Sequence, residues 1–165
     1  MTDARHKPIP PGFKPVKLGG PYMVTIGPFY LAEDETNARL GMYIERQHCN
    51  PLAIVHGGLL SSFADMSMPV LFYKHPAVVA SGRVAPTVSL QVDFIGAARM
   101  GDWIESQAEV LKVSRSLIFA QSKVFANGQL VLRASGVYKF GPVFSVELGM
   151  YNDEIIPEMI HHGHR

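Results

Sequence analysis

The hydrophobic pattern changes along the chain, and each change predicts a different kind of element. Between residues 28 and 44 the apolar positions form two short groups, separated by the acidic turn 33–35, which is typical of a strand hairpin. Between residues 56 and 74 they recur at three- and four-residue spacing and leave almost no polar face. That spacing predicts a helix buried on nearly all sides.

Apolar and polar residues then alternate over most of the remaining chain, which predicts half-buried antiparallel strands. The predicted strands cover 87–94, 104–110, 117–126 and 129–140. Asn127-Gly128 joins the last two, and both residues tolerate the positive φ of a type I′ turn. We expect residues 76–86 to form a loop. One sheet wrapped around one helix is an α+β fold, and its uncovered face and edge favour self-association.

Pro69 lies inside the predicted helix, four residues after Asp65. A proline has no backbone N–H, so it cannot donate a hydrogen bond to the carbonyl of Asp65. We therefore expect a kink, or an early end of regular helix, just after Asp65.

The two ends of the chain differ from its centre. Residues 1–24 carry five prolines, which predicts an extended arm that lies on the domain or stays mobile. Residues 25–140 form the predicted domain, and we assign no firm structure to the extension 141–165. Histidines near the C-terminus lack carboxylate or thiolate ligands at defined spacing, so we expect no metal site.

Composition narrows the classes of function. A chain of 165 residues with 47% hydrophobic and 18% charged residues fits one globular domain. A net charge of +1 gives no electrostatic reason to bind nucleic acid or an acidic membrane surface. One cysteine excludes an internal disulfide framework, and no apolar run reaches the roughly 20 residues of a membrane span. The beginning MTDARHKPIPP has no apolar signal core, so we expect a cytoplasmic protein.

Candidate chemistry gathers at His56-Gly57-Gly58 and Asp65, the one charged residue between Gly57 and Tyr73. The first N–H groups of a helix have no internal partner, so the glycine amides can polarise a carbonyl and stabilise an oxyanion; alternatively, the glycines only make a tight turn. A buried carboxylate is costly. Asp65 is therefore either a general base or nucleophile, or an aspartate satisfied by a structural partner.

Two further residues near this segment have open interpretations. His56 contacts a ligand, or it is a structural hydrogen bonder at the start of the helix. Asn50 precedes Pro51, which holds it in extended backbone and leaves its amide free to bind a water or a carbonyl.

Taken together, these motifs resemble the hotdog-fold acyl-CoA thioesterases of the phenylacetate-pathway type, within the 4-hydroxybenzoyl-CoA thioesterase superfamily. The matching motifs, which cover roughly residues 28–140, are Asn50-Pro51, the HGG of 56–58, Asp65, the strand 87–94, Gly101-Asp102 and Ser114-Arg115-Ser116. The resemblance implies a sheet wrapped around a central helix. It also implies homodimers that usually form tetramers, with active sites in the dimer interface.

The resemblance also implies roles for individual residues. Asp65 would be the base or nucleophile, and the Gly57 N–H would be the oxyanion donor. Asn50 and Thr87 would place the attacking water, with His56 beside the thioester. The substrate would be an acyl-CoA, so no cofactor is expected apart from the CoA of the substrate itself.

The substrate-binding residues that we expect are Gly58, Phe63, Met68, Arg99 and Arg115. Phe63 and Met68 suggest an adaptable apolar acyl pocket. Gly96-Ala97-Ala98 stands where relatives commonly have an Arg-Pro-like pair. Arg99 and Arg115 are therefore considered for the CoA phosphates, with surface solvation as the alternative.

Two other functions stay open at this point. A hotdog hydratase or dehydratase would need a histidine paired with a carboxylate, and only His56 with Asp65 offers such a pair. A non-catalytic acyl-CoA sensor would keep the pocket without turnover, although binding alone does not require a buried carboxylate.

Overall fold

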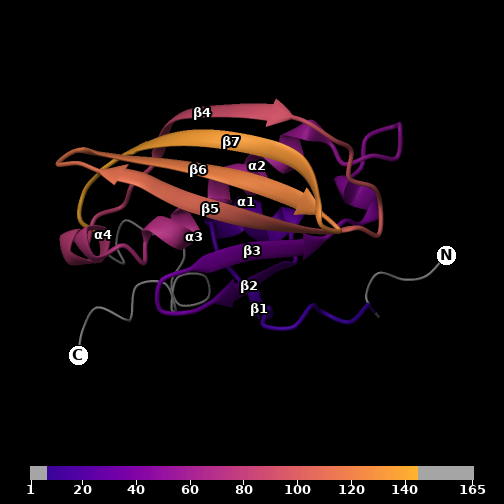
Figure 1. Cartoon of the computed structure of the whole chain (residues 1–165), viewed down its shortest axis with the longest axis horizontal. Coiled ribbons are helices and arrows are strands. Elements are labelled where there is room, and N and C mark those ends of the chain that lie inside the picture. The colour runs from indigo at the N-terminus through magenta and orange to yellow at the C-terminus, as the bar shows by residue number, and fades with distance from the viewer. Residues whose placement is uncertain (1–6, 145–165) are drawn as a thin grey trace.

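A computed structural model describes residues 7–144, and its strands form one antiparallel sheet (Figure 1). The seven strands lie in the order β1-β2-β3-β5-β6-β7-β4. Their bounds are β1 Lys14–Val16, β2 Phe29–Glu33, β3 Ala38–Tyr43, β4 Thr87–Phe94, β5 Trp103–Val113, β6 Leu117–Ala126 and β7 Gln129–Lys139. The sequence placed the hairpin 28–44 and the four later strands correctly, and among the described strands β4 is an edge strand that pairs with β7 alone.

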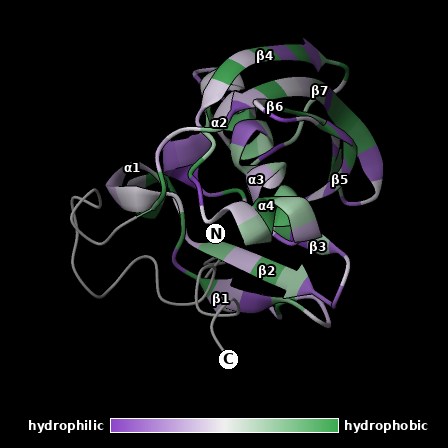
Figure 2. Cartoon of the chain, turned by 90° about the vertical axis from the view of Figure 1, so that its left-hand side faces the viewer, coloured by the Kyte–Doolittle hydropathy of each residue, from purple (hydrophilic) through white to green (hydrophobic). Residues whose placement is uncertain are grey.

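Helices fill the concave side of this sheet. Their bounds are α1 Gly20–Ile26, α2 Gly57–Ser67, α3 Pro69–Phe72 and α4 Pro76–Ser81, with a short 3₁₀ turn over Arg46–His48. Figure 2 shows the sheet curving around α2 and α3, which confirms the α+β arrangement of a sheet wrapped around a helix. No helix within residues 7–144 is long and apolar enough to cross a membrane.

Two local predictions agree with the backbone. Asn127 and Gly128 have φ values of 47° and 84° in the β6–β7 turn, as a type I′ turn requires. The central helix is interrupted where Pro69 was expected to interrupt it, because α2 ends at Ser67 and α3 begins at Pro69. Met68 between them keeps helical φ and ψ, so the chain continues in nearly the same direction with a break in its hydrogen bonding.

The N-terminal segment lies on the domain, one of the two arrangements expected for it, but it is not extended throughout. Residues 14–16 pair with β2, and residues 20–26 are helical. Leu18 and Met23 are 2% and 3% exposed and belong to the main core, so this segment is packed on the domain. Their burial outweighs the proline-rich local sequence. The first six residues, and the extension beyond residue 144 with its histidines, lie outside the described range.

The segment 76–86 also differs from the expected loop, because it contains α4. Pro76 occupies the first turn, where its missing N–H costs nothing, and Gly82 ends the helix with a φ of 59°. Proline at the start and glycine after the end are a helix signal that the sequence contained.

Candidate active site

The start of α2 is closed by His56, which is its N-cap residue. The imidazole Nδ1 accepts the Gly58 N–H at 2.9 Å. Since Nδ1 is an acceptor, the proton of a neutral ring lies on Nε2. His56 is therefore the structural hydrogen bonder considered above, and its exposed ring leaves the Nε2–H free to meet a ligand.

The Gly57 amide is the free donor at this helix start. Among the described residues no acceptor binds its N–H, whereas the Gly58 amide already donates to His56. The Phe94 ring lies beside Gly57, since a Cβ added at residue 57 would be 3.2 Å from Phe94 Cζ. Glycine thus lets an aromatic ring approach an unpaired amide at the positive end of the helix dipole.

Asn50 has a more local role than expected. Its Oδ1 accepts from the Leu52 N–H at 2.9 Å and lies 3.4 Å from the Ile54 amide nitrogen, so the side chain closes the turn before α2. The expectation of a free amide is therefore half wrong, because the oxygen is engaged. The NH₂ group has no partner among the described residues.

Asp65 lies near the end of α2 and is held from two neighbouring strands. Thr87 donates its hydroxyl to Asp65 Oδ1 at 2.8 Å, and the Tyr138 hydroxyl donates to the Asp65 carbonyl at 3.0 Å. The carboxylate is half-buried rather than buried, because it faces the open edge strand β4. Burial, with the charge of Asp65, raises the pKa of Tyr138, so that the phenol stays a neutral donor.

The predicted catalytic residues therefore form two separate groups. Asn50, His56 and Gly57 lie at the start of α2, whereas Asp65 and Thr87 lie near its end. Eight residues of helix separate Gly57 from Asp65, which is about 12 Å along the axis. One thioester carbonyl cannot accept from the Gly57 amide and meet the Asp65 carboxylate of the same chain.

The expected acyl-pocket residues lie elsewhere. Phe63 and Met68 are both 0% exposed and belong to the main core, so neither lines an open pocket, and that expectation is corrected. The Phe63 ring packs against Phe29 of β2, with centroids 6.2 Å apart, and Met68 Cε would lie 3.0 Å from a Cβ at Gly136 of β7, so both side chains fill the interior.

The two arginines that were considered for CoA phosphates are exposed and far apart. Arg99 precedes β5 and bridges to Ile54 near the start of α2, whereas Arg115 follows β5 in the next turn. An eleven-residue strand lies between them, so about 35 Å separates the two ends. A single CoA bound to one chain therefore meets one of them at most.

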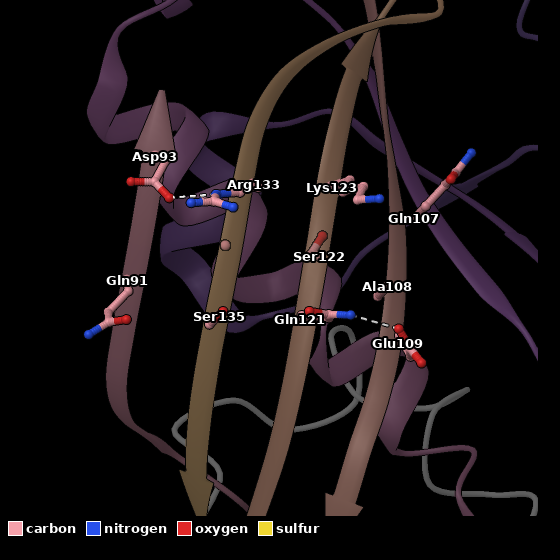
Figure 3. Close-up of a pocket in the computed structure, with 11 residues that line it drawn as sticks. Gln91, Asp93, Gln107, Ala108, Glu109, Gln121, Ser122, Lys123, Arg133 and Ser135 are labelled. Atoms are coloured by element: carbon pink, nitrogen blue, oxygen red, sulfur yellow. Dashed lines mark hydrogen bonds and ion pairs between the residues drawn. The ribbon is translucent and has the colours of Figure 1, made fainter. Parts of the chain in front are cut away.

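A shallow polar hollow lies on the opposite, outer face of the sheet (Figure 3). It crosses the four strands from β4 to β5, and its lining includes two side-chain pairs, Asp93 with Arg133 at 2.7 Å and Gln121 with Glu109 at 2.7 Å. The helices lie behind the strands in this view. None of the predicted catalytic residues lines this hollow.

Sequence reasoning missed two residues at the site. Tyr138 lies 73 residues from Asp65, and no local pattern links the two. Phe94 belonged to the apolar face of a predicted strand, but nothing in the sequence placed it beside Gly57. Both contacts depend on how α2 crosses the sheet.

Comparison with known proteins identifies the family to which this chain belongs. The thioesterase superfamily matches residues 52–132. A Pseudomonas aeruginosa protein provisionally named an esterase is 34% identical over 79% of this chain and 96% of its own length. Mouse acyl-coenzyme A thioesterase 13 is 32% identical over 48% of this chain and 54% of its own length.

Solved structures agree on the fold. A variant of the phenylacetic acid degradation protein PaaI from Thermus thermophilus has a TM-score of 0.62 at 20% identity, over 72% of this chain and 97% of that one. The seven-stranded antiparallel sheet and the helix that it encloses are those of the hotdog fold. The chain belongs to the thioesterase superfamily, a family of thioester hydrolases that includes the phenylacetate-pathway type.

Proposed function

We propose that this protein hydrolyses the thioester of an acyl-CoA to a free acid and CoA, at sites formed between two copies of the chain. The observation that carries the proposal is the pair of groups on α2: an unpaired Gly57 amide at its start and an Asp65 carboxylate held by Thr87 near its end. The family supports thioester hydrolysis, and a relative named as an acyl-CoA thioesterase supports the choice of substrate.

The edge strand β4 supports the assembly. Gly57 lies beside Phe94, the last residue of β4, while Asp65 bonds to Thr87, the first. If β4 of a second copy pairs antiparallel about a twofold axis between Leu90 and Gln91, Thr87 comes opposite Phe94 of the partner subunit. Each Asp65 then faces the Gly57 amide of the partner subunit, so that one site no longer has to span the distance of about 12 Å within one chain.

The exposed surface of β4 agrees with such pairing. Val88 and Phe94 of β4, and Ile95 directly after it, are 56%, 54% and 51% exposed in the single chain, and no strand of the described residues pairs with the outer edge of β4. An unpaired apolar edge is a template for another strand. Two such dimers would form the homotetramer that the resemblance implies.

In the proposed reaction the thioester oxygen accepts the Gly57 N–H, which stabilises the negative charge that develops during attack. Asp65 of the other subunit removes a proton from water, or attacks the carbonyl carbon itself to give an anhydride that water opens. A C–O bond forms, the C–S bond breaks, and the CoA thiolate takes the proton. A lost oxyanion donor typically costs about 10²- to 10³-fold in kcat, and a lost general base about 10²- to 10⁴-fold.

The remaining polar groups fit supporting roles in this reaction. The Asn50 NH₂ and the His56 Nε2–H lie at the same end as the Gly57 amide and suit the thioester or its water. Thr87 donates its hydroxyl hydrogen to Asp65 and so orients the carboxylate. No cofactor is needed besides the CoA of the substrate. Cys49 is a free thiol, in keeping with the reducing cytoplasm that we propose as the compartment.

A hydratase or dehydratase fits this geometry less well. His56 and Asp65 lie about 13 Å apart along the helix axis. Nδ1 of His56 is bound to Gly58, and Asp65 is bound to Thr87, so the two side chains do not pair within the chain.

The test is hydrolysis of a panel of aliphatic and aromatic acyl-CoAs, followed by thiol release, with Asp65→Asn beside the parent protein. We expect Asp65→Asn to lose most of kcat while it still binds the CoA ester. Asp34→Asn is the matched control, because Asp34 lies in the turn between β2 and β3, and the amide oxygen of asparagine can still accept from the Thr36 and Asn37 N–H groups. Parental turnover in Asp65→Asn contradicts the mechanism, and binding without turnover in the parent favours the sensor.

A further inference from the structure

We propose that Tyr138 is a positioning residue for Asp65, because its hydroxyl replaces the backbone hydrogen bond that Pro69 removes from the central helix. This proposal rests on the proposed hydrolysis, in which Asp65 is the base or nucleophile. It gives strand β7 a part in the site and explains how a helix can break directly after its functional carboxylate.

The break leaves backbone carbonyls that need donors. In a continuous helix the amide of residue 69 would donate to the Asp65 carbonyl, and proline has no such hydrogen. The Tyr138 hydroxyl donates to this carbonyl at 3.0 Å. The preceding carbonyl, of Ala64, accepts from the Ser67 hydroxyl at 2.7 Å. Two side-chain hydroxyls thus donate to the carbonyls of the consecutive residues Ala64 and Asp65 and hold the end of α2 in place.

The surroundings of Tyr138 fix the position of its hydroxyl. The side chain is fully buried, and its ring meets Phe72 edge-on with centroids 4.8 Å apart. Gly136 lies on the same face of β7, two residues earlier, and a Cβ there would be 2.7 Å from Tyr138 Cε2 and 2.8 Å from its hydroxyl oxygen. Because Gly136 has no side chain, the Tyr138 ring can lie over the strand and its hydroxyl can reach Asp65.

The sheet register joins Tyr138 to the residue that binds the carboxylate. Tyr138 pairs with Thr87 across β7 and β4, and both hydroxyls approach Asp65 from these adjacent strands. Thr87 binds Oδ1, while the phenol oxygen binds the backbone carbonyl and lies 3.4 Å from Oδ1. The backbone and the carboxylate of Asp65 are therefore held by two neighbouring residues of one rigid sheet.

The test is Tyr138→Phe, made in the parent and in a Pro69→Ala background that restores an amide donor to the Asp65 carbonyl. In the parent we expect kcat for acyl-CoA to fall roughly 5- to 100-fold, with KM changed less than about twofold, since substrate does not touch Tyr138. In the Pro69→Ala background the same substitution should cost much less. The urea midpoint should follow the same pattern, with the larger shift in the parent.

Tyr73→Phe is the matched control. Tyr73 is half-buried and its hydroxyl accepts the Ala85 N–H at 3.0 Å, away from Asp65, so its loss should leave kcat at the parental level. Parental kcat in Tyr138→Phe, or equal losses in both backgrounds, overturns the proposal. If the parent hydrolyses no acyl-CoA, the proposed function fails on its own. The unfolding midpoints then still decide whether Tyr138 replaces the lost hydrogen bond, and equal shifts in both backgrounds refute it.

Discussion

The Thr87 hydroxyl donates to Asp65 Oδ1 across 2.8 Å and so ties the first residue of the edge strand to the end of the central helix. The contact joins residues 22 positions apart. It orients the carboxylate toward the open edge of β4, which is the side from which a second chain can approach.

Thr87→Val should lower kcat because it keeps the shape of the side chain and removes the donor to Asp65. A hydrogen bond to a charged group is worth about 1.5–3 kcal/mol, so we expect a loss of roughly 10- to 100-fold. Thr87→Ser keeps the hydroxyl and should retain most of the activity. Steady-state kinetics measures both, with Thr25→Val as the control, since within residues 7–144 the Thr25 hydroxyl bonds only to the Pro21 carbonyl in α1. Full activity in Thr87→Val would refute the assigned role.

Two inactive variants should restore activity when they share a dimer. If each site combines Gly57 of one chain with Asp65 of the other, Gly57→Val and Asp65→Asn chains together form one intact site per mixed dimer. Random mixing should then recover about a quarter of the parental activity, because half of the dimers are mixed and half of their sites are intact. The measurement is thiol release after refolding the two variants together. A mixture that stays inactive would show that each site lies within one chain.

Gly57→Ala should couple to Phe94. A Cβ at residue 57 lies 3.2 Å from Phe94 Cζ, which is closer than ordinary contact, so the ring or the helix start must shift. We expect Gly57→Ala to lower kcat less in a Phe94→Leu background than in the parent, because the smaller leucine side chain leaves room for the added methyl group. A double-mutant cycle in kcat/KM measures the coupling, and additive effects would contradict the proximity.

Acid should destabilise the fold through His48. This side chain is 3% exposed, its Nδ1 accepts the Glu45 N–H, and its Nε2 has no partner among the described residues. Burial lowers the pKa of His48 from its usual 6.5, so the folded state keeps it neutral while the unfolded chain binds a proton. The part of the free energy of unfolding that depends on neutral His48 is present above pH 6.5. It is lost as the pH falls below 6.5, by at most about 1.4 kcal/mol per pH unit.

Urea unfolding at pH 7.5 and pH 5.5 tests this prediction. His48→Asn keeps an acceptor near Glu45 and does not titrate, so its free energy of unfolding should change less between the two values. His75→Asn is the control, because His75 is half-buried rather than buried and caps α4 through Ala77, a role that asparagine also fills. An unchanged pH dependence in His48→Asn would contradict the assignment.

Between residues 28 and 140 the sequence by itself determined the strands and the central helix, because their signals are local, but it missed α4. Alternation located the four later strands, the Asn127-Gly128 pair located their last turn, and Pro69 located the break in the central helix. It also singled out the glycines and the carboxylate of α2. Each of these signals depends on a few neighbouring residues and on backbone preferences that act at short range.

Only the tertiary structure decided which distant residues meet. Periodicity shows which side of an element is apolar, but not which residue of another element packs on it. The fold therefore decided that Thr87 and Tyr138 hold Asp65, that Phe94 lies beside Gly57, and that Met68 fills the core. It also placed the Gly57 amide and the Asp65 carboxylate about 12 Å apart on one helix, and the proposal of a site between two chains rests on this separation.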